Sequence, residues 1–195
     1  MSIIRCIICT LIAISVLALP SVSQAETPGV KQVGQTHVVG NTTITHTTLS
    51  DVKEIQCLAK NIYYESANEP EEGKVAVGLV TLNRTVDSRF PSSICGVVHQ
   101  RLRSGESKHH TVCQFSWTCS KLNSPQSENN CWQESQRIAK LLVLQPAVYK
   151  KLQSKYSNAL YFHAVSVHPN WSHHKLKIAR IGAHWFYRDR VSMNI

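Results

Sequence analysis

Apolar residues first recur at helical spacing just after residue 50. The positions i, i+3, i+4 and i+7 are all filled by apolar side chains, which predicts one buried helix face made of Ile55, Leu58, Ala59 and Ile62. Ser50 or Asp51 is expected to cap this helix, with Glu54 as the capping-box partner. Pro70 ends it, because the residue before a proline is pushed out of helical geometry.

Further helices are predicted over residues 71–85, 92–102 and 132–143, and another short one after Pro146. The helix over 71–85 is apolar enough to be central, and its acidic first turn suits the positive end of the helix dipole. The last third has strand patterns over 159–165 and 178–187, around a loop at Pro169 and Asn170. Helices followed by a small antiparallel sheet near the C-terminus predict an α+β fold.

Residues 1–25 have the pattern of a secretory signal peptide. Arg5 supplies a positive charge, an apolar run covers residues 7–19, and small residues precede a cut before Glu26. The run is shorter than the ~20 residues needed to span a bilayer, which favours cleavage over an uncleaved anchor. The protein is therefore expected in the periplasm, or outside the cell at the wall, with no stable membrane span after cleavage.

The segment 26–50 is rich in Thr, Val, Gly and His and lacks a helical period, so it is expected to be an extended linker. The folded domain is then expected over residues 51–190. The formal net charge of +9 favours polyanionic partners such as nucleic acid, anionic lipid or a cell-wall polymer. Export argues against nucleic acid, and a monomer is expected.

Five cysteines follow the signal segment: Cys57, Cys95, Cys113, Cys119 and Cys131. In an oxidising compartment such cysteines are disulfide candidates. The odd number predicts that at least one is unpaired or paired between chains, and the spacing does not determine which residues pair.

Glu65 departs from the hydrophobic pattern. It follows Leu58 by seven positions and Ile62 by three, so it extends the apolar stripe rather than the wet face. A buried carboxylate is costly unless it is paired or functional, and burial raises its pKa, as a general acid near neutral pH requires. The alternative is that this last turn has left the core and Glu65 is solvated. Glu69 could share the face, or be a surface acid beside Pro70.

Several ordered motifs resemble the SleB-type cell-wall hydrolase family, which includes spore-cortex-lytic enzymes. They are Tyr64-Glu65-Ser66-Ala67-Asn68-Glu69-Pro70, Gly73-Lys74-Val75-Ala76-Val77, Leu82-Asn83-Arg84, Phe90-Pro91, Cys113-Gln114-Phe115-Ser116-Trp117, Ala159-Leu160-Tyr161-Phe162 and Ile181-Gly182-Ala183-His184-Trp185-Phe186-Tyr187. The resemblance covers roughly residues 54–188. This chain differs from the spore enzymes in lacking an N-terminal wall-binding repeat and in carrying a Cys-bearing loop around residues 103–131. Wall remodelling or attack on a foreign wall therefore fits as well as germination.

The resemblance implies a lysozyme-like catalytic domain that cleaves peptidoglycan between N-acetylmuramic acid and N-acetylglucosamine, with Glu65 as its catalytic residue and no cofactor. Glycosidases usually use two carboxylates, whereas a lytic transglycosylase can use one. Acids are sparse after Glu106, which favours the one-acid route, with Asp87 and Glu69 as open second candidates. Substrate-binding candidates, each of which could instead be structural, are Glu69, Asn83, Arg84, Gln114, Phe115, Tyr161, His163, Trp171 and His184.

Three other interpretations stay open. Ten histidines suggest a zinc amidase, but none forms a His-Glu-x-x-His spacing, so no metal is expected. A wall cysteine peptidase would need a free thiol beside a histidine, and Cys57 is the candidate. A non-enzymatic, basic wall-binding module would suit the charge but gives no reason for Glu65 to lie on an apolar face.

Overall fold

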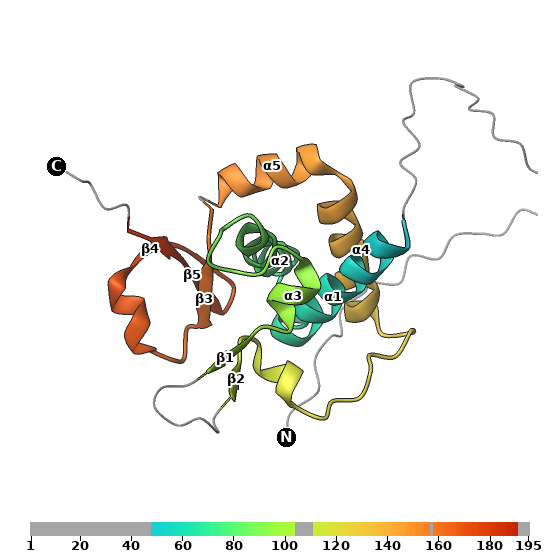
Figure 1. Ribbon diagram of the computed structural model, residues 1–195, viewed down its shortest axis with the longest axis horizontal. Coiled ribbons are helices and arrows are strands. Elements are labelled where there is room, and N and C mark those ends of the chain that lie inside the picture. Colours follow the sequence, from blue (N-terminus) through green and yellow to red (C-terminus); the bar gives the residue numbers. More distant parts are fainter. Residues whose placement is uncertain (1–47, 104–110, 157, 191–195) are drawn as a thin grey trace, which may run out of the picture. The chain divides into compact units, whose positions relative to one another are not determined.

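The computed structural model describes residues 48–103, 111–156 and 158–190 of the 195-residue chain. The helices are α1 (Leu49–Ser66), α2 (Glu71–Thr85), α3 (Ile94–Val98), α4 (Asn130–Leu144) and α5 (Pro146–Lys155), with short 3-10 turns η1 (Ser116–Cys119) and η2 (Asn170–His174). The strands are β1 (Arg101–Arg103), β2 (Thr111–Cys113), β3 (Tyr161–Ala164), β4 (Lys175–Ile181) and β5 (His184–Asp189) (Figure 1). The predicted α+β class, rich in helix and with an antiparallel sheet near the C-terminus, is confirmed. The predicted signal peptide and most of the linker lie outside the described residues.

Helix α1 begins earlier than the sequence pattern suggested. Thr48 is its N-cap, and Asp51 completes the capping box: the Asp51 N–H donates to Thr48 Oγ1 at 3.1 Å, and the Thr48 N–H donates to Asp51 Oδ2 at 2.8 Å. The predicted cap at Ser50 or Asp51 was therefore wrong, because Thr48 already satisfies the first free N–H groups. The predicted apolar face is confirmed, since all four of its residues are buried.

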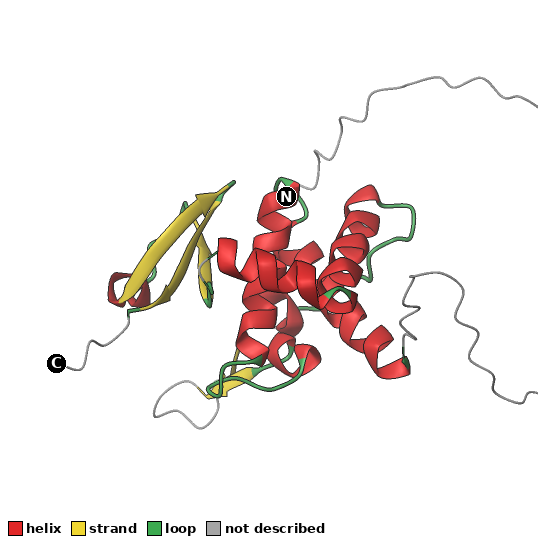
Figure 2. Ribbon diagram, turned by 90° about the horizontal axis from the view of Figure 1, so that it is seen from above, coloured by secondary structure: helices red, strands yellow, loops and turns green. Residues whose placement is uncertain are grey.

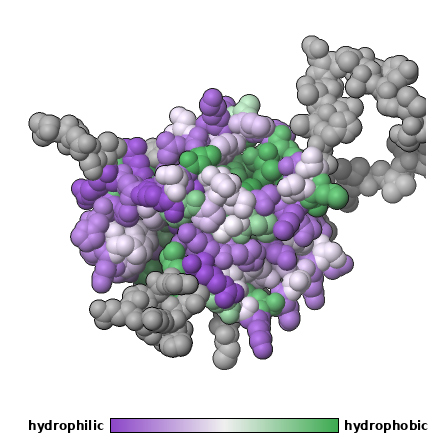
Figure 3. All heavy atoms as spheres, in the orientation of Figure 1, coloured by the Kyte–Doolittle hydropathy of each residue, from purple (hydrophilic) through white to green (hydrophobic). Residues whose placement is uncertain are grey.

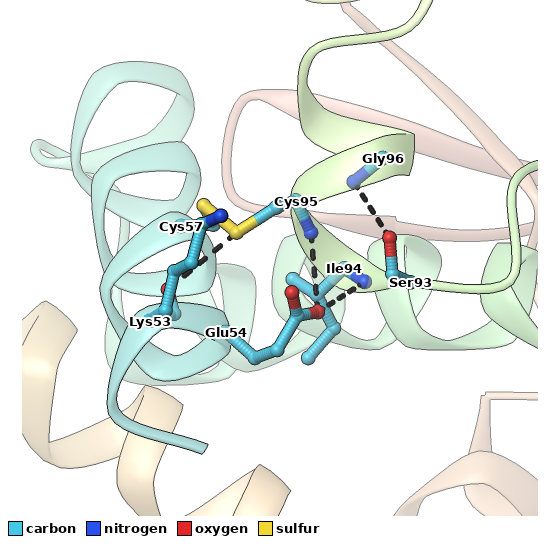
Figure 4. Close-up of a disulfide and its surroundings, with 7 residues drawn as sticks. All are labelled: Lys53, Glu54, Cys57, Ser93, Ile94, Cys95 and Gly96. Carbon is cyan, nitrogen blue, oxygen red and sulfur yellow. Dashed lines mark hydrogen bonds between the residues drawn. A yellow bond between two sulfur atoms is a disulfide. The ribbon is translucent and has the colours of Figure 1, made fainter. Parts of the chain in front are cut away.

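Glu54, expected to cap α1, instead caps α3. Its Oε2 accepts hydrogen bonds from the N–H groups of Ile94 at 2.5 Å and Cys95 at 3.2 Å (Figure 4). A carboxylate at this end satisfies free N–H groups and suits the helix dipole. The adjacent Cys57–Cys95 disulfide joins α1 to α3 covalently. The two helices are thus held together by hydrogen bonds to the Glu54 carboxylate and by a disulfide.

Helix α2 is the centre of the helical region. Its residues 73–84 are all buried, and α1, α3, α4 and α5 pack around it. Its bounds agree with the predicted range 71–85. Lys74, buried within α2, is neutralised by Glu134 of α4. Figure 2 shows these helices grouped apart from the three-stranded sheet.

The C-terminal sheet has the strand order β3-β5-β4, and both pairings are antiparallel. Because paired residues share a face, Phe162, Phe186 and Ile181 lie on the face that joins the hydrophobic core. His163, Trp185 and Tyr187 lie on the opposite face.

Two assignments from the sequence, one strand and one helix, were wrong. The single strand predicted over 178–187 is a hairpin of β4 and β5, which turns at Gly182 with φ +55°. A left-handed turn favours glycine, because glycine has no Cβ to clash there. The helix predicted over 92–102 ends at Val98, and β1 then pairs with β2 in a two-stranded sheet.

Candidate active site

Glu65 lies in the last turn of α1, half-buried. Burial raises the pKa of its carboxyl to about 7, while the positive charge of Arg84 acts in the opposite direction. Neither a hydrogen bond nor an ion pair ties this carboxyl to another residue of the described ranges. A carboxyl with these properties can hold a proton near neutral pH, where an ordinary carboxyl is ionised, and can transfer it.

Arg84 is the charged residue of the described ranges that acts on Glu65. It lies in the last turn of α2, only 3% exposed, and its Nε–H donates to the carbonyl oxygen of Leu160 at 2.9 Å. Its buried Nη1 has no hydrogen-bond partner in the described part of the chain. Burial lowers its pKa to about 10, so the guanidinium stays charged at neutral pH. A fixed cation is thereby kept near Glu65.

Three aromatic rings surround the Arg84 guanidinium. Its central carbon lies 5.1 Å from the ring centroid of Phe90, 5.5 Å from that of Phe115 and 5.9 Å from that of Tyr161. These rings come from the loop after α2, the start of η1 and strand β3, so three segments fix one side chain. Cation–π contacts of this kind hold a cation in place without neutralising it.

Tyr64, the residue before Glu65, forms an aromatic pair with Trp117. Their rings stack with centroids 4.6 Å apart. The Trp117 indole N–H donates to Asn61 Oδ1 at 2.9 Å, and the Asn61 amide donates to Thr81 Oγ1 at 3.0 Å. Trp117 and Asn61 were not among the predicted site residues. The motif that ends at Trp117 was visible in the sequence, but its pairing with α1 was not.

Glu69 and His184 lie in a structural contact between the α1–α2 loop and the β4–β5 hairpin. Glu69 Oε2 accepts the N–H of Ala183 at 2.8 Å and lies 3.7 Å from His184 Nδ1. Burial lowers the pKa of His184, and the nearby Glu69 carboxylate partly offsets this. A Cβ at Gly182 would come within 1.9 Å of Glu69 Oε2, so the glycine allows the carboxylate to approach. Both side chains are 11% exposed, and their contacts are with the protein.

Asn83 is also bound within the protein. Its amide donates to the carbonyl oxygen of Ala159 at 2.8 Å, and its Oδ1 accepts from Tyr149 at 3.2 Å and Gln153 at 3.1 Å. The side chain therefore joins α2 to α5 and to the segment before β3. Gln114 is half-buried after β2, and its backbone N–H donates to Gln100 O at 2.9 Å.

Three of the predicted candidates in the last third, Tyr161, His163 and Trp171, gather on the outer face of the sheet. Trp171 of η2 lies 5.8 Å from Tyr161, 5.5 Å from His163 and 5.5 Å from Tyr187, between ring centroids. His163 Nδ1 contacts the carbonyl oxygen of Ala164 at 2.9 Å and so carries a proton. Tyr161 belongs to this cluster and to the rings around Arg84, so it links the two.

The structure thus brings Glu65, Arg84, Phe115 and Tyr161 together and connects Trp171 and His163 to them through Tyr161. Glu69, His184 and Asn83 lie in networks that hold elements together. Asp87, an open candidate for a second carboxylate, is bound by Arg89 at 2.6 Å, which lowers its pKa to about 2.

The structure bears on two of the other interpretations, the cysteine peptidase and the zinc amidase. Cys57 is bonded to Cys95, so the proposed free nucleophilic thiol at Cys57 was wrong. A second disulfide joins Cys113 to Cys119, while Cys131 is buried at the start of α4. Across the described ranges no three His, Cys, Asp or Glu side chains are grouped as a metal site would require. None of the helices in those ranges is long and apolar enough to cross a membrane.

Comparison with known proteins identifies relatives. The family described as Cell Wall Hydrolase matches residues 68–187. Spore cortex-lytic enzymes of Bacillus subtilis and Bacillus cereus are each 43% identical, over 49 and 47 residues, or 25% and 24% of this chain. These segments span only 16% and 18% of the relatives' own lengths.

Two solved structures are also similar to this chain. They are the catalytic domain of SleB from Bacillus cereus and that of the germination-specific lytic transglycosylase SleB from Bacillus anthracis. Each is 22% identical with a TM-score of 0.49; they cover 76% and 77% of this chain and all of the solved chain. The family match covers more than half of the chain, although it begins three residues after Glu65. The chain belongs to the cell wall hydrolase family.

Proposed function

We propose that this protein is a lytic transglycosylase that cleaves peptidoglycan between N-acetylmuramic acid and N-acetylglucosamine, with Glu65 as its single catalytic acid and base. The observation that carries the proposal is the state of Glu65: half-buried, unpaired among the described residues, and with its pKa raised to about 7. Membership of the cell wall hydrolase family supports peptidoglycan as the substrate. Its predicted signal peptide supports action outside the cytoplasm.

The proposed reaction uses one carboxyl group twice, first as an acid and then as a base. Protonated Glu65 donates its proton to the glycosidic oxygen as the bond from that oxygen to C1 of the muramic acid breaks. The resulting carboxylate then takes the proton of the C6 hydroxyl, whose oxygen attacks C1 and closes a 1,6-anhydro ring. Glu65 ends the cycle protonated, and no water is consumed.

Arg84 fits the second half of this cycle. Its fixed positive charge favours the carboxylate form of Glu65, whereas burial favours the acid form. The two opposing effects hold the pKa near neutral, where a group can serve both as acid and as base. The aromatic rings around the guanidinium leave its charge uncompensated by any other described carboxylate.

The occupation of both candidate second carboxylates in the described part of the chain supports the one-acid route. In the described ranges the two other candidates are occupied: Asp87 pairs with Arg89, and Glu69 binds the Ala183 N–H. A hydrolysing glycosidase would need such a group free to activate water or to act as nucleophile.

The test is mass spectrometry of purified peptidoglycan digested in water enriched in oxygen-18. The unmodified protein is compared with Glu65→Gln and with Glu128→Gln, an exposed carboxylate that serves as the matched control. We expect 1,6-anhydro-muramic products from the unmodified protein and the control, and none from Glu65→Gln. Reducing-end sugars that carry oxygen-18 would contradict the transglycosylase route. Cut peptides, or equal activity of Glu65→Gln, would contradict the assignment of Glu65 and favour an amidase or peptidase.

A further inference from the structure

A pocket of about 430 Å³ opens on the outer face of the C-terminal sheet, and the proposed reaction does not use it. Its walls come from all three strands, from η2 and from the segments on either side, and its lining includes three permanent cations, Lys175, Lys177 and Arg190. Among its described lining residues, three are histidines and none is acidic. Its volume is within the range of small-ligand pockets, roughly 300–1,000 Å³. The space-filling view shows a mainly hydrophilic surface where β4 and η2 lie (Figure 3).

The cations of this pocket differ in how far they are neutralised. Lys175 is paired with Asp189, and Arg89 binds the other carboxylate oxygen of Asp189 at 2.7 Å. Lys177 has no ion pair with any described carboxylate; its ammonium lies 4.1 Å from the ring centroid of Trp185. Lys177 therefore offers a positive charge that is positioned but not compensated. An anion is the ligand that such a site favours.

The aromatic rings of the pocket argue against recognition of a sugar by stacking. A sugar would need an open ring face, but Lys177 covers Trp185, and the Arg180 guanidinium carbon lies 6.0 Å from the same ring. Tyr187 stacks on His163 with ring centroids 5.1 Å apart, and Trp171 contacts the Tyr187 ring in an edge-to-face arrangement. These rings are in contact with cations or with other rings, so a ligand in the pocket meets charged groups rather than open ring faces.

We infer that this pocket binds a carboxylate of the peptide stem of peptidoglycan. The inference rests on the proposed function, because it takes peptidoglycan as the substrate. The stem peptides carry free carboxylates close to the glycan strand. Tyr161 and Trp171 form a continuous run of rings from Arg84 of the candidate active site to this pocket. A stem bound here would favour strands that still carry their peptides.

The binding test uses the full chain and three probes: the tetrapeptide L-alanyl-D-glutamyl-meso-diaminopimelyl-D-alanine, the same peptide with its carboxylates amidated, and inorganic phosphate. Affinity is measured by calorimetry, and the indole N–H signal of Trp185, assigned with Trp185→Phe, reports whether the probe occupies the pocket. We expect the free tetrapeptide to bind and to shift that signal, and the amidated peptide to bind at least about tenfold more weakly.

Lys177→Gln removes the uncompensated charge, and Lys150→Gln on the exposed surface of α5 is the matched control. We expect Lys177→Gln to weaken tetrapeptide binding about tenfold and Lys150→Gln to leave it unchanged. Equal binding of the free and amidated peptides, or no effect of Lys177→Gln, would overturn the inference. So would phosphate binding at Trp185 without tetrapeptide binding, since it would indicate a phosphate ligand. Binding of the tetrapeptide requires no cleavage of the glycan. If the protein binds the tetrapeptide but does not cleave glycan strands, the proposed function is refuted and the binding inference stands.

Discussion

The helical region and the C-terminal sheet each contain a partly buried carboxyl group, and the two differ in how it is bonded. At the end of α1, the Glu65 carboxyl forms no hydrogen bond or ion pair with another described residue. In the sheet, Asp189 accepts from Lys175 and Tyr161 and pairs with Arg89. A carboxylate held by cations and a hydroxyl stays ionised, whereas a buried carboxyl without such bonds can hold a proton and release it. The comparison therefore favours Glu65, rather than Asp189, as the group that transfers a proton.

The largest expected effect separates an unpaired carboxylate from a paired one. Glu65→Gln should lower the rate of glycan cleavage by about 10³-fold or more, because it removes the proton that is transferred. Asp87→Asn, which removes a carboxylate paired with Arg89, should change the rate by less than about threefold, because Asp87 is not expected to take part. Release of soluble muropeptides measures both. A similar loss in the two variants would contradict a special role for the unpaired Glu65 carboxyl.

The two disulfides should contribute unequally to the stability of the fold. Cys57–Cys95 closes a loop of 38 residues between α1 and α3, whereas Cys113–Cys119 spans 6 residues. Loop-closure entropy predicts that replacing both cysteines by alanine costs about 4 kcal/mol of unfolding free energy for the first pair and roughly 2 kcal/mol for the second. Urea unfolding of the two double variants measures this difference. Equal losses would show that local strain or packing, rather than loop length, sets the contribution.

Gly182→Ala tests how tightly the hairpin is held against the helical region. An alanine must adopt φ +55° there, and its Cβ would collide with Glu69 Oε2. We expect a loss of roughly 2–3 kcal/mol in the free energy of unfolding. Adding Glu69→Ala removes the collision but not the strained φ, so the double variant should lose less than the sum of the single changes. Strict additivity in chemical denaturation would mean that the two side chains do not meet.

The smallest effect is on stability at different pH values. Glu65 binds its proton more tightly in the folded state than its ordinary pKa of 4.5 would allow, so it opposes folding progressively as pH rises from about 4.5 through 7. Glu65→Gln should therefore unfold at nearly the same free energy as the unmodified protein below pH 4. It should be more stable by roughly 1–2 kcal/mol at pH 8, given that Glu65 is only half-buried. Denaturation at pH 4 and pH 8 measures the difference, and a gain that did not depend on pH would point to packing instead.

Local sequence signals identified much of the helical region. The buried face of α1 and the limits of α2 follow from apolar spacing, Pro70 and an acidic first turn, all of which act within a few residues. The hairpin at Gly182 was missed because a single glycine between two apolar runs does not distinguish one long strand from two. The strands β1 and β2 are three residues each, too short for a pattern.

The candidate site was predictable only in part. Glu65 could be found because its own helix places it on an apolar stripe. The environment of Arg84 could not, since its rings come from Phe90, Phe115 and Tyr161, which lie in three separate segments. Glu69 binds the N–H of a residue 114 positions away, so its structural role has no local signature.

Direct titration of the Glu65 carboxyl tests whether this group is the proton donor in glycan cleavage. Carbon-13 labelling of glutamate side chains, with Glu65→Gln to assign the Glu65 signal, gives its pKa by NMR; glycan cleavage is followed over the same pH range. We expect a midpoint at about 7 and a loss of cleavage as pH rises through that value, because the proton donor is then ionised. A midpoint near the ordinary value of 4.5, with cleavage that persists above pH 7, would contradict the assignment of Glu65 as the acid.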